Sequence, residues 1–222
     1  MALNPIEYRN LFVGVEGAIG IGKTTAAKKV AQILGYDFYE EPTTGAIERL
    51  RKKFYKDMEK YAALFQYKIF IRRFYQHMNI ILNLNYKGAI QDRTIYGDKP
   101  FAYMLYDSGL IDEEQLEVYE DLWGAFRHLL VEPDMMFFFY ADIPVLMKRI
   151  HGDRKREEES GITPEYLEAL IEKTHILKED REKHGVICFE LDWNDPNTNI
   201  DTMVHLIRQT SESKASKWAK IR

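Results

Sequence analysis

The sequence predicts an α/β fold, in which helices cover both faces of a parallel β-sheet. Short apolar runs alternate along the chain with longer amphipathic stretches, which is the order expected of strand–helix–strand units. One of these runs, "MMFFFY" at residues 135–140, is apolar without a break, as expected for a strand buried on both faces. The length of 222 residues allows one sizeable core, so we expect a single domain over residues 1–222.

Each expected element follows from its own pattern. The apolar runs predict five strands, at residues 10–17, 36–41, 88–94, 133–142 and 185–193. Apolar residues at helical spacing predict helices at 23–34, 46–85 with a break near Asp57, 98–107, 113–130, from 143 onward, 163–183 and 199–210. Pro164 stands in the first turn of one of these helices, where proline is tolerated. The tail after Ser211 has no clear pattern, and we expect it to be loose.

Composition narrows the class of protein. A net charge of −4 and a pI near 5.9 do not favour nonspecific electrostatic binding to nucleic acid. No apolar run reaches the length of a membrane span, and the polar start "MALNPIEYRN" lacks the apolar core of a signal peptide. A single cysteine, Cys188, cannot form a disulfide within the chain. We therefore expect a cytoplasmic protein without nucleic-acid or membrane partners.

The strongest motif is "GAIGIGKT", which fits the pattern G-x-x-x-x-G-K-[ST] between a predicted strand and a predicted helix. Its glycines let backbone N–H groups face a phosphate chain, the lysine can reach the outer phosphates, and the threonine hydroxyl can hold Mg²⁺. The predicted ATP-binding residues of this loop are Gly17, Ala18, Ile19, Gly20, Ile21, Gly22, Lys23, Thr24 and Thr25. The pattern predicts a P-loop protein that binds a nucleoside triphosphate.

Several classes of nucleotide-binding protein share this loop. A GTPase would carry N-K-x-D and D-x-x-G motifs, and neither stands at a plausible position in this sequence. A motor protein is usually longer. Small-molecule kinases remain, and their acceptor is either a nucleoside or a nucleoside monophosphate.

Residues at the ends of two predicted strands bear on the acceptor. Asp92 could hold Mg²⁺ through water, and Arg93 could stabilise charge on the transferring phosphoryl group. Neighbouring strand residues point to opposite faces, so both can act together only at a strand end or a turn. Glu41 could act as a base for a hydroxyl acceptor. Thymidylate kinases typically carry Arg-Glu-Pro here, and Glu40 in place of that arginine favours an uncharged acceptor.

A second set of residues could form an acceptor pocket. Tyr55, Gln66 and Arg73 would lie near one helical face if the helix axis were continuous, and Asp98 could pair with Arg73 at the floor of a base pocket. A glutamine can pair with a base edge, and a tyrosine hydroxyl can reach a sugar hydroxyl. Phe101 is included among the substrate-binding residues, although its spacing by itself favours a core position.

The segment "KRIHGDRKR" at residues 148–156 carries five basic residues before "EEESG". It is either a solvated helix end or a lid, at about residues 149–161, that brings arginines onto the triphosphate. The arginines that could act in such a lid are Arg149, Arg154 and Arg156.

Taken together, the motifs resemble the deoxyribonucleoside kinase family. The resemblance rests on "GAIGIGKT", "EEP", "FYKDMEKYAALFQ", "QDRTIYGD" and "RKREEESGITPEYLEAL", which span residues 12 to about 170. The stretch "FYKDM" is similar to the bacterial deoxyadenosine and deoxyguanosine kinase branch. The family resemblance implies a five-stranded parallel sheet, a homodimer, and transfer of the ATP γ-phosphate to a deoxynucleoside 5′-hydroxyl in nucleotide salvage.

The resemblance also implies roles for single residues. Glu41 would be the base, with Arg93 beside it, while Lys23, Thr24 and Asp92 would serve phosphate and Mg²⁺. The implied substrate contacts are Tyr55 and Glu159 to the sugar 3′-hydroxyl, and Gln66, Arg73 and Asp98 to the base. Because the arginine and aspartate at the base are both present, a purine deoxynucleoside or deoxycytidine is favoured over thymidine. The open alternatives are a thymidylate-type monophosphate kinase and a catalytically silent nucleotide-binding subunit.

Overall fold

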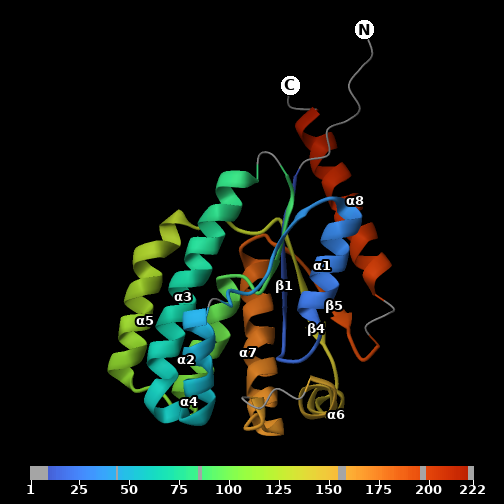
Figure 1. Cartoon of the computed structure of the whole chain (residues 1–222). Coiled ribbons are helices and arrows are strands. Elements are labelled where there is room, and N and C mark those ends of the chain that lie inside the picture. The colour runs from blue at the N-terminus through green and yellow to red at the C-terminus, as the bar shows by residue number, and fades with distance from the viewer. Residues whose placement is uncertain (1–9, 44, 85–86, 155–158, 196–198, 220–222) are drawn as a thin grey trace.

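The protein is a five-stranded sheet between two layers of helices, as a computed structural model shows (Figure 1). The structure describes residues 10–43, 45–84, 87–154, 159–195 and 199–219. The strands are β1 (Phe12–Gly17), β2 (Asp37–Tyr39), β3 (Ala89–Asp92), β4 (Met135–Tyr140) and β5 (Ile187–Asp192). They lie in the order β2-β3-β1-β4-β5, and every neighbouring pair is parallel. The predicted fold class is confirmed, and each strand is shorter than predicted by a few residues at its ends.

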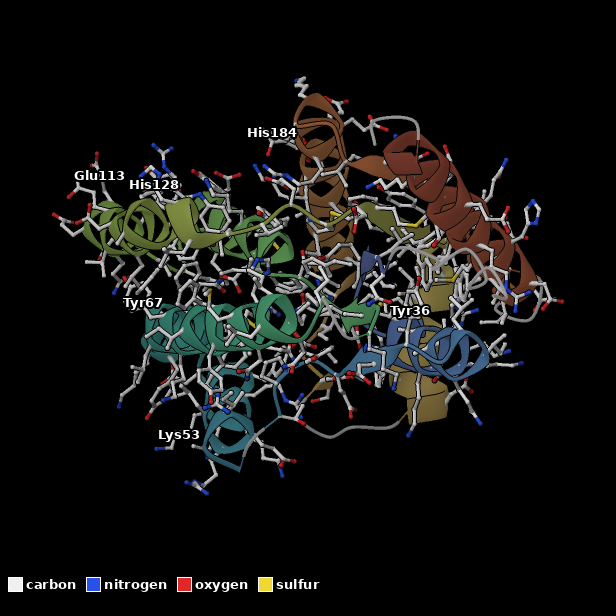
Figure 2. The ribbon with its side chains drawn as sticks, turned by 90° about the horizontal axis from the view of Figure 1, so that it is seen from above. Tyr36, Lys53, Tyr67, Glu113, His128 and His184 are labelled. Atoms are coloured by element: carbon white, nitrogen blue, oxygen red, sulfur yellow. The ribbon has the colours of Figure 1, made fainter. Side chains whose placement is uncertain are left out.

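Alternate side chains of the central strands face the two layers. Val13 and Phe137 pack against α1 (Lys23–Leu34) and α8 (Ile200–Ala219), while Met136 and Phe138 pack against α3 (Met58–Asn83), α5 (Glu113–Phe126) and α7 (Pro164–Lys183). Seen from above, α3 and α5 lie side by side, and α1 and α8 lie on the opposite side of the molecule (Figure 2). The strand β4 is buried along nearly its whole length, as its unbroken apolar run predicts.

The long helical region breaks where the sequence indicates. α2 (Gly45–Lys56) ends before Asp57, whose side chain caps α3 by accepting a hydrogen bond from the backbone N–H of Lys60 at 3.2 Å. The two helices then pack against each other. The helix axis is therefore not continuous between Tyr55 and Gln66. The prediction that these residues share one helical face required a continuous axis, so it does not hold.

The remaining elements are short or lie near the predicted positions. A 3₁₀ turn (Tyr96–Asp98) precedes α4 (Lys99–Asp107), and a second 3₁₀ turn (Arg127–Leu129) follows α5. α6 (Ile143–Met147) continues into a π-helical segment (Lys148–Arg154). None of the helices within the described ranges is long and apolar enough to cross a membrane.

The prediction of a loose tail is wrong, because α8 continues through Ser211 to Ala219. Ser211 is buried, and Lys214 forms an ion pair with Asp134. Asp134 also accepts a hydrogen bond from the backbone N–H of Phe12 at 2.8 Å. These contacts join α8 to the starts of β1 and β4, which no local sequence pattern indicates.

Candidate active site

The predicted site residues converge at the carboxyl ends of β1, β2 and β3, where parallel α/β sheets bind ligands. A cavity of about 420 Å³ opens there. The predicted residues that line it are Ile19, Gly20, Gly22, Lys23, Thr24, Thr25, Glu41, Tyr55, Gln66, Arg73, Asp92, Arg93, Phe101 and Glu159. The cavity therefore joins the phosphate loop to most of the residues predicted for the acceptor.

The phosphate loop connects β1 to α1. Gly20 and Gly22 have φ values of 79° and 106°, in the left-handed region that glycine adopts without strain. Lys23, the first residue of α1, folds back so that its ammonium donates to the carbonyls of Gly17 at 3.1 Å and Ala18 at 2.9 Å. Burial, together with the positive charge of Arg93, lowers the pKa of Lys23 to about 8, although nearby carboxylates oppose this shift.

Thr24 and Asp92 form the part of the site that suits a cation. The Thr24 hydroxyl donates to Asp92 Oδ2, while Oδ1 of the same carboxylate is buried without a hydrogen-bond partner within the described residues. Burial raises the pKa of Asp92, and Lys23 opposes that change. An unpartnered carboxylate oxygen beside a hydroxyl is a donor set that fits Mg²⁺, which prefers oxygen ligands.

Arg93 follows β3 directly and adopts φ 63°, an unusual conformation for a residue with a side chain. Because the chain turns at Arg93, directly after the end of β3, the side chains of Asp92 and Arg93 can both reach the site. The guanidinium donates from Nη2 to the Gly17 carbonyl at 3.0 Å, and its Nε lies 3.4 Å from Glu41 Oε1. Its central carbon stands 4.6 Å from the centre of the Phe101 ring. Arg93 thus bridges the phosphate loop and the acceptor side.

A chain of ionic contacts forms the acceptor side of the cavity. Glu41 Oε1 lies 2.5 Å from Arg73 Nη2, and Arg73 also pairs with the buried carboxylate of Asp98. Gln66 donates from Nε2 to Asp98 Oδ2 at 2.7 Å. The pairing of Arg73 with Asp98 is confirmed. Asp98 itself is buried behind the cavity wall, and it holds Gln66 and Arg73, which line the cavity.

The charges around Glu41 decide its ionisation. Burial by itself would raise its pKa, but the positive charges of Arg73, Arg93 and Lys23 outweigh burial and lower the pKa to about 2. Glu41 is therefore a carboxylate throughout the neutral pH range. A carboxylate in that state can accept a hydrogen bond and a proton from a hydroxyl group.

Tyr55 reaches the same cavity from α2 even though the helix breaks after it. Burial and the nearby groups of Tyr166, Glu159 and Glu41 raise its pKa well above the usual value, so the hydroxyl keeps its proton. Glu159 is buried and lines the cavity with it. Phe101 is half-buried at the cavity wall, so it is both packed and exposed to the site.

The basic segment divides into a described and an undescribed part. Arg149 donates to the carbonyls of Ile21 at 3.2 Å, Trp193 at 3.0 Å and Asn194 at 2.9 Å. It lines a second cavity of about 370 Å³ beside the phosphate loop, and it does not line the acceptor cavity. Of the other two predicted lid arginines, Arg154 ends the π-helical segment, and Arg156 lies outside the described residues.

The structure adds a residue that the motifs did not indicate. Glu16, next to the phosphate loop in β1, is buried, and its carboxylate accepts hydrogen bonds from Thr94 and lies 3.6 Å from Arg93. The signal in the sequence was a single acid in the otherwise apolar strand "FVGVEG". A buried carboxylate in a strand requires polar partners, so it indicates a site.

Comparison with known proteins places the chain in a family. The model of the deoxynucleoside kinase family matches residues 13–212, which is most of the chain. The chain belongs to the deoxynucleoside kinase family. Two relatives from Dictyostelium discoideum support this placement. The deoxyadenosine kinase is 31% identical over 82% of this chain and 72% of its own length, and the deoxyguanosine kinase is 30% identical over 86% and 67%.

A solved structure shares the fold of this deoxynucleoside kinase. It is the deoxyadenosine kinase from M. mycoides with bound dATP, which matches with a TM-score of 0.76 over 89% of this chain and 99% of that chain. The sequence identity of that pair is 24%, so the likeness supports the fold.

Proposed function

We propose that this deoxynucleoside kinase phosphorylates the 5′-hydroxyl of a purine deoxynucleoside or of deoxycytidine with ATP, in nucleotide salvage, and that the chain forms one kinase domain. The observation that carries the proposal is the contact chain Gln66–Asp98–Arg73–Glu41, which runs from the buried far wall of the cavity to the half-buried Glu41, next to Arg93 and the phosphate loop. The relatives named deoxyadenosine and deoxyguanosine kinase agree with a purine acceptor.

The proposed transfer follows from the charges in the site. The ATP phosphates lie on the loop with Lys23, and Arg93 lies between that loop and Glu41. As the acceptor oxygen bonds to the γ-phosphorus and the bond to the ADP oxygen breaks, Glu41 takes the hydroxyl proton. Lys23 and Arg93 stabilise the charge on the transferring group. Thr24 and Asp92 would hold Mg²⁺, which neutralises phosphate charge when it is bound.

Gln66 is held so that it can read the edge of a base. Its amide N–H groups donate to Asp98, which orients the amide oxygen as an acceptor. Adenine, guanine and cytosine carry an exocyclic amino group that can donate to such an oxygen. The N3–H of thymine can also donate to it, so the preference over thymidine rests on the presence of Arg73 and Asp98 and not on this oxygen. Tyr55 and Glu159 are the proposed partners of the sugar 3′-hydroxyl.

The acids at the cavity support a neutral acceptor. Glu40 lines the cavity beside Glu41, so two carboxylates stand near the acceptor entrance. Both would repel a monophosphate. On the donor side, the cavity lined by Arg149 adjoins the phosphate loop, which supports a donor contact for Arg149. For Arg154 and Arg156 a donor contact is proposed from the family resemblance alone.

A competition assay tests the proposal. The purified protein is given ATP, Mg²⁺ and an equal mixture of the four deoxynucleosides, and the monophosphates are quantified. We expect a purine or deoxycytidine product and little thymidine monophosphate. Phosphorylation of thymidine monophosphate with no deoxynucleoside turnover would instead identify a thymidylate-type kinase. Absence of turnover with every acceptor would identify a silent nucleotide-binding subunit.

We also propose that two copies pair through α3 and α5. On α3, the exposed side chains Leu64, Ile71, Tyr75 and Leu82 recur at intervals of seven, four and seven residues, which forms one apolar stripe. On α5, which packs beside α3, Val118 is also exposed. Tyr67 joins the two helices by donating to the Gln115 carbonyl at 2.5 Å (Figure 2).

A second copy suits this surface better than a different partner, because a straight stripe on a 26-residue helix is complementary to itself across a twofold axis. Sedimentation of the wild-type protein should give a dimer, and Ile71→Glu should give a monomer. Ile176→Glu is the matched control, since Ile176 is similarly exposed on α7. A monomeric wild-type protein would contradict the proposal.

A further inference from the structure

Glu16 is an acid inside an apolar strand. It lies beside Phe138 of β4 in the sheet, and 1% of its surface is exposed. A carboxylate removed from water is strongly destabilising unless hydrogen bonds and positive charge compensate it. The contacts that offset the cost of burying the Glu16 carboxylate therefore indicate why an acid stands at this position.

Both oxygens of the carboxylate are used. Oε1 accepts hydrogen bonds from the backbone N–H of Thr94 at 2.7 Å and from the Thr94 hydroxyl at 2.8 Å. Oε2 lies 3.6 Å from Arg93 Nη1. Gly97 packs so closely against the carboxylate that a Cβ at this position would overlap its oxygens. The turn after β3 is therefore built around Glu16.

The Arg93 side chain is held at each of its nitrogens. Nε lies near Glu41, Nη2 donates to the Gly17 carbonyl, and Nη1 faces Glu16. The backbone of Arg93 is in the left-handed region. The backbone N–H of the next residue, Thr94, donates to Glu16. One carboxylate thus contacts both the turn that aims Arg93 and the guanidinium itself.

We propose that Glu16 is a positioning residue that holds Arg93 in the orientation needed for phosphoryl transfer. The proposal rests on the function proposed above for this site. Glu16 also precedes Gly17 directly, so it ties the start of the phosphate loop to the turn that follows β3. It would act through Arg93 and would not touch either substrate.

The test is Glu16→Gln, which keeps an oxygen to accept from Thr94 and removes the charge that faces Arg93. We expect kcat to fall by about tenfold or more with little change in the KM for ATP, because the lost interaction acts in the transition state. Gly97→Ala is the second variant, since it retains the Glu16 charge but displaces the carboxylate. It should lower kcat in the same way. Glu190→Gln removes a carboxylate from exposed β5 and should leave kcat unchanged.

A double-mutant cycle separates positioning from a general structural role. If Glu16 acts through Arg93, Glu16→Gln should add little to the loss caused by Arg93→Lys. Additive losses, or a wild-type kcat in the Glu16→Gln protein, would overturn the proposal.

Crystal structures of the wild-type and Glu16→Gln proteins give a readout that does not depend on turnover. We expect the Arg93 guanidinium to leave the Gly17 carbonyl in the variant, and an unmoved guanidinium would contradict the inference. If the wild-type protein phosphorylates no deoxynucleoside, the proposed function fails, while these structures still decide the role of Glu16.

Discussion

The phosphate loop and the acceptor wall are the two halves of one cavity, and they are built in different ways. The loop consists of consecutive residues, Gly17–Thr24, and its shape depends on glycine conformations and backbone groups. The acceptor wall joins side chains from three separate segments, with Glu41 after β2, Arg73 on α3 and Asp98 after β3. Damage to the loop should therefore weaken ATP binding, whereas damage to the wall should affect the acceptor and the chemistry.

The largest effect is expected from Glu41→Gln. Loss of a positioned base typically lowers turnover by about 10²- to 10⁴-fold. ATP binding should persist, because the loop does not depend on Glu41, and this can be measured by calorimetry with ATP. Glu40→Gln is the matched neighbour and should cause a far smaller loss. Near-normal turnover in Glu41→Gln would contradict the assignment of the base.

A change in the loop should show the opposite pattern. Gly22→Ala puts a Cβ on a residue with φ 106°, about 3.4 Å from the Trp193 indole nitrogen. Strain of this kind amounts to about 1–3 kcal/mol, so the KM for ATP should rise by roughly 5- to 100-fold. The KM for the deoxynucleoside should change little. Gly109→Ala is the control, because Gly109 also has a positive φ but has no neighbouring atoms within 4 Å of the added Cβ.

Asp98→Asn tests the wall without touching the cavity. It removes the charge that holds Arg73 and weakens the support of Gln66. Hydrogen bonds to charged groups contribute about 1.5–3 kcal/mol, so kcat/KM for the deoxynucleoside should fall by roughly 10- to 100-fold. Steady-state kinetics with ATP held saturating measures this loss. Asp107→Asn, which removes a surface ion pair with Lys173, should have little effect, and an equal loss there would argue against a specific role.

The smallest effect on catalysis is expected at His77, which lies on the buried face of α3 and away from the cavity. Burial lowers its pKa to about 4, and its ring accepts a hydrogen bond from the backbone N–H of Val131 at 3.1 Å. The unfolded chain binds a proton near pH 6.5, so stability is fully present above that pH and is lost as pH falls toward 4. The loss can reach about 3 kcal/mol.

His77→Gln removes this titration and keeps a side-chain acceptor for Val131. Urea unfolding at pH 7.5 and pH 5 should show a smaller difference in the variant than in the wild-type protein, with turnover retained. His184→Gln, at the exposed end of α7, is the control (Figure 2). A pH dependence of stability that is unchanged in His77→Gln would contradict this account.

Local patterns explain how much of the molecule could be predicted. The phosphate loop is a run of adjacent residues with defined backbone geometry, so its motif predicted both its place and its form. The unbroken run of β4 and the break at Asp57 were also visible in local sequence. Contacts between segments that are far apart in the sequence could not be predicted from local patterns. The contact that holds α8 to the start of β4, for example, joins Lys214 to Asp134, which are 80 positions apart in the chain.

The sequence by itself determined the fold class and the phosphate loop, because residue type and spacing specify these features. Only the tertiary structure decided that α2 folds back to bring Tyr55 into the cavity, that Arg149 lies beside the loop and not over the acceptor, and that Glu16 faces Arg93. The physical reason is that a buried charge must find its partner in space. Glu16 and Arg93 are 77 residues apart in the chain and adjacent only in the folded sheet.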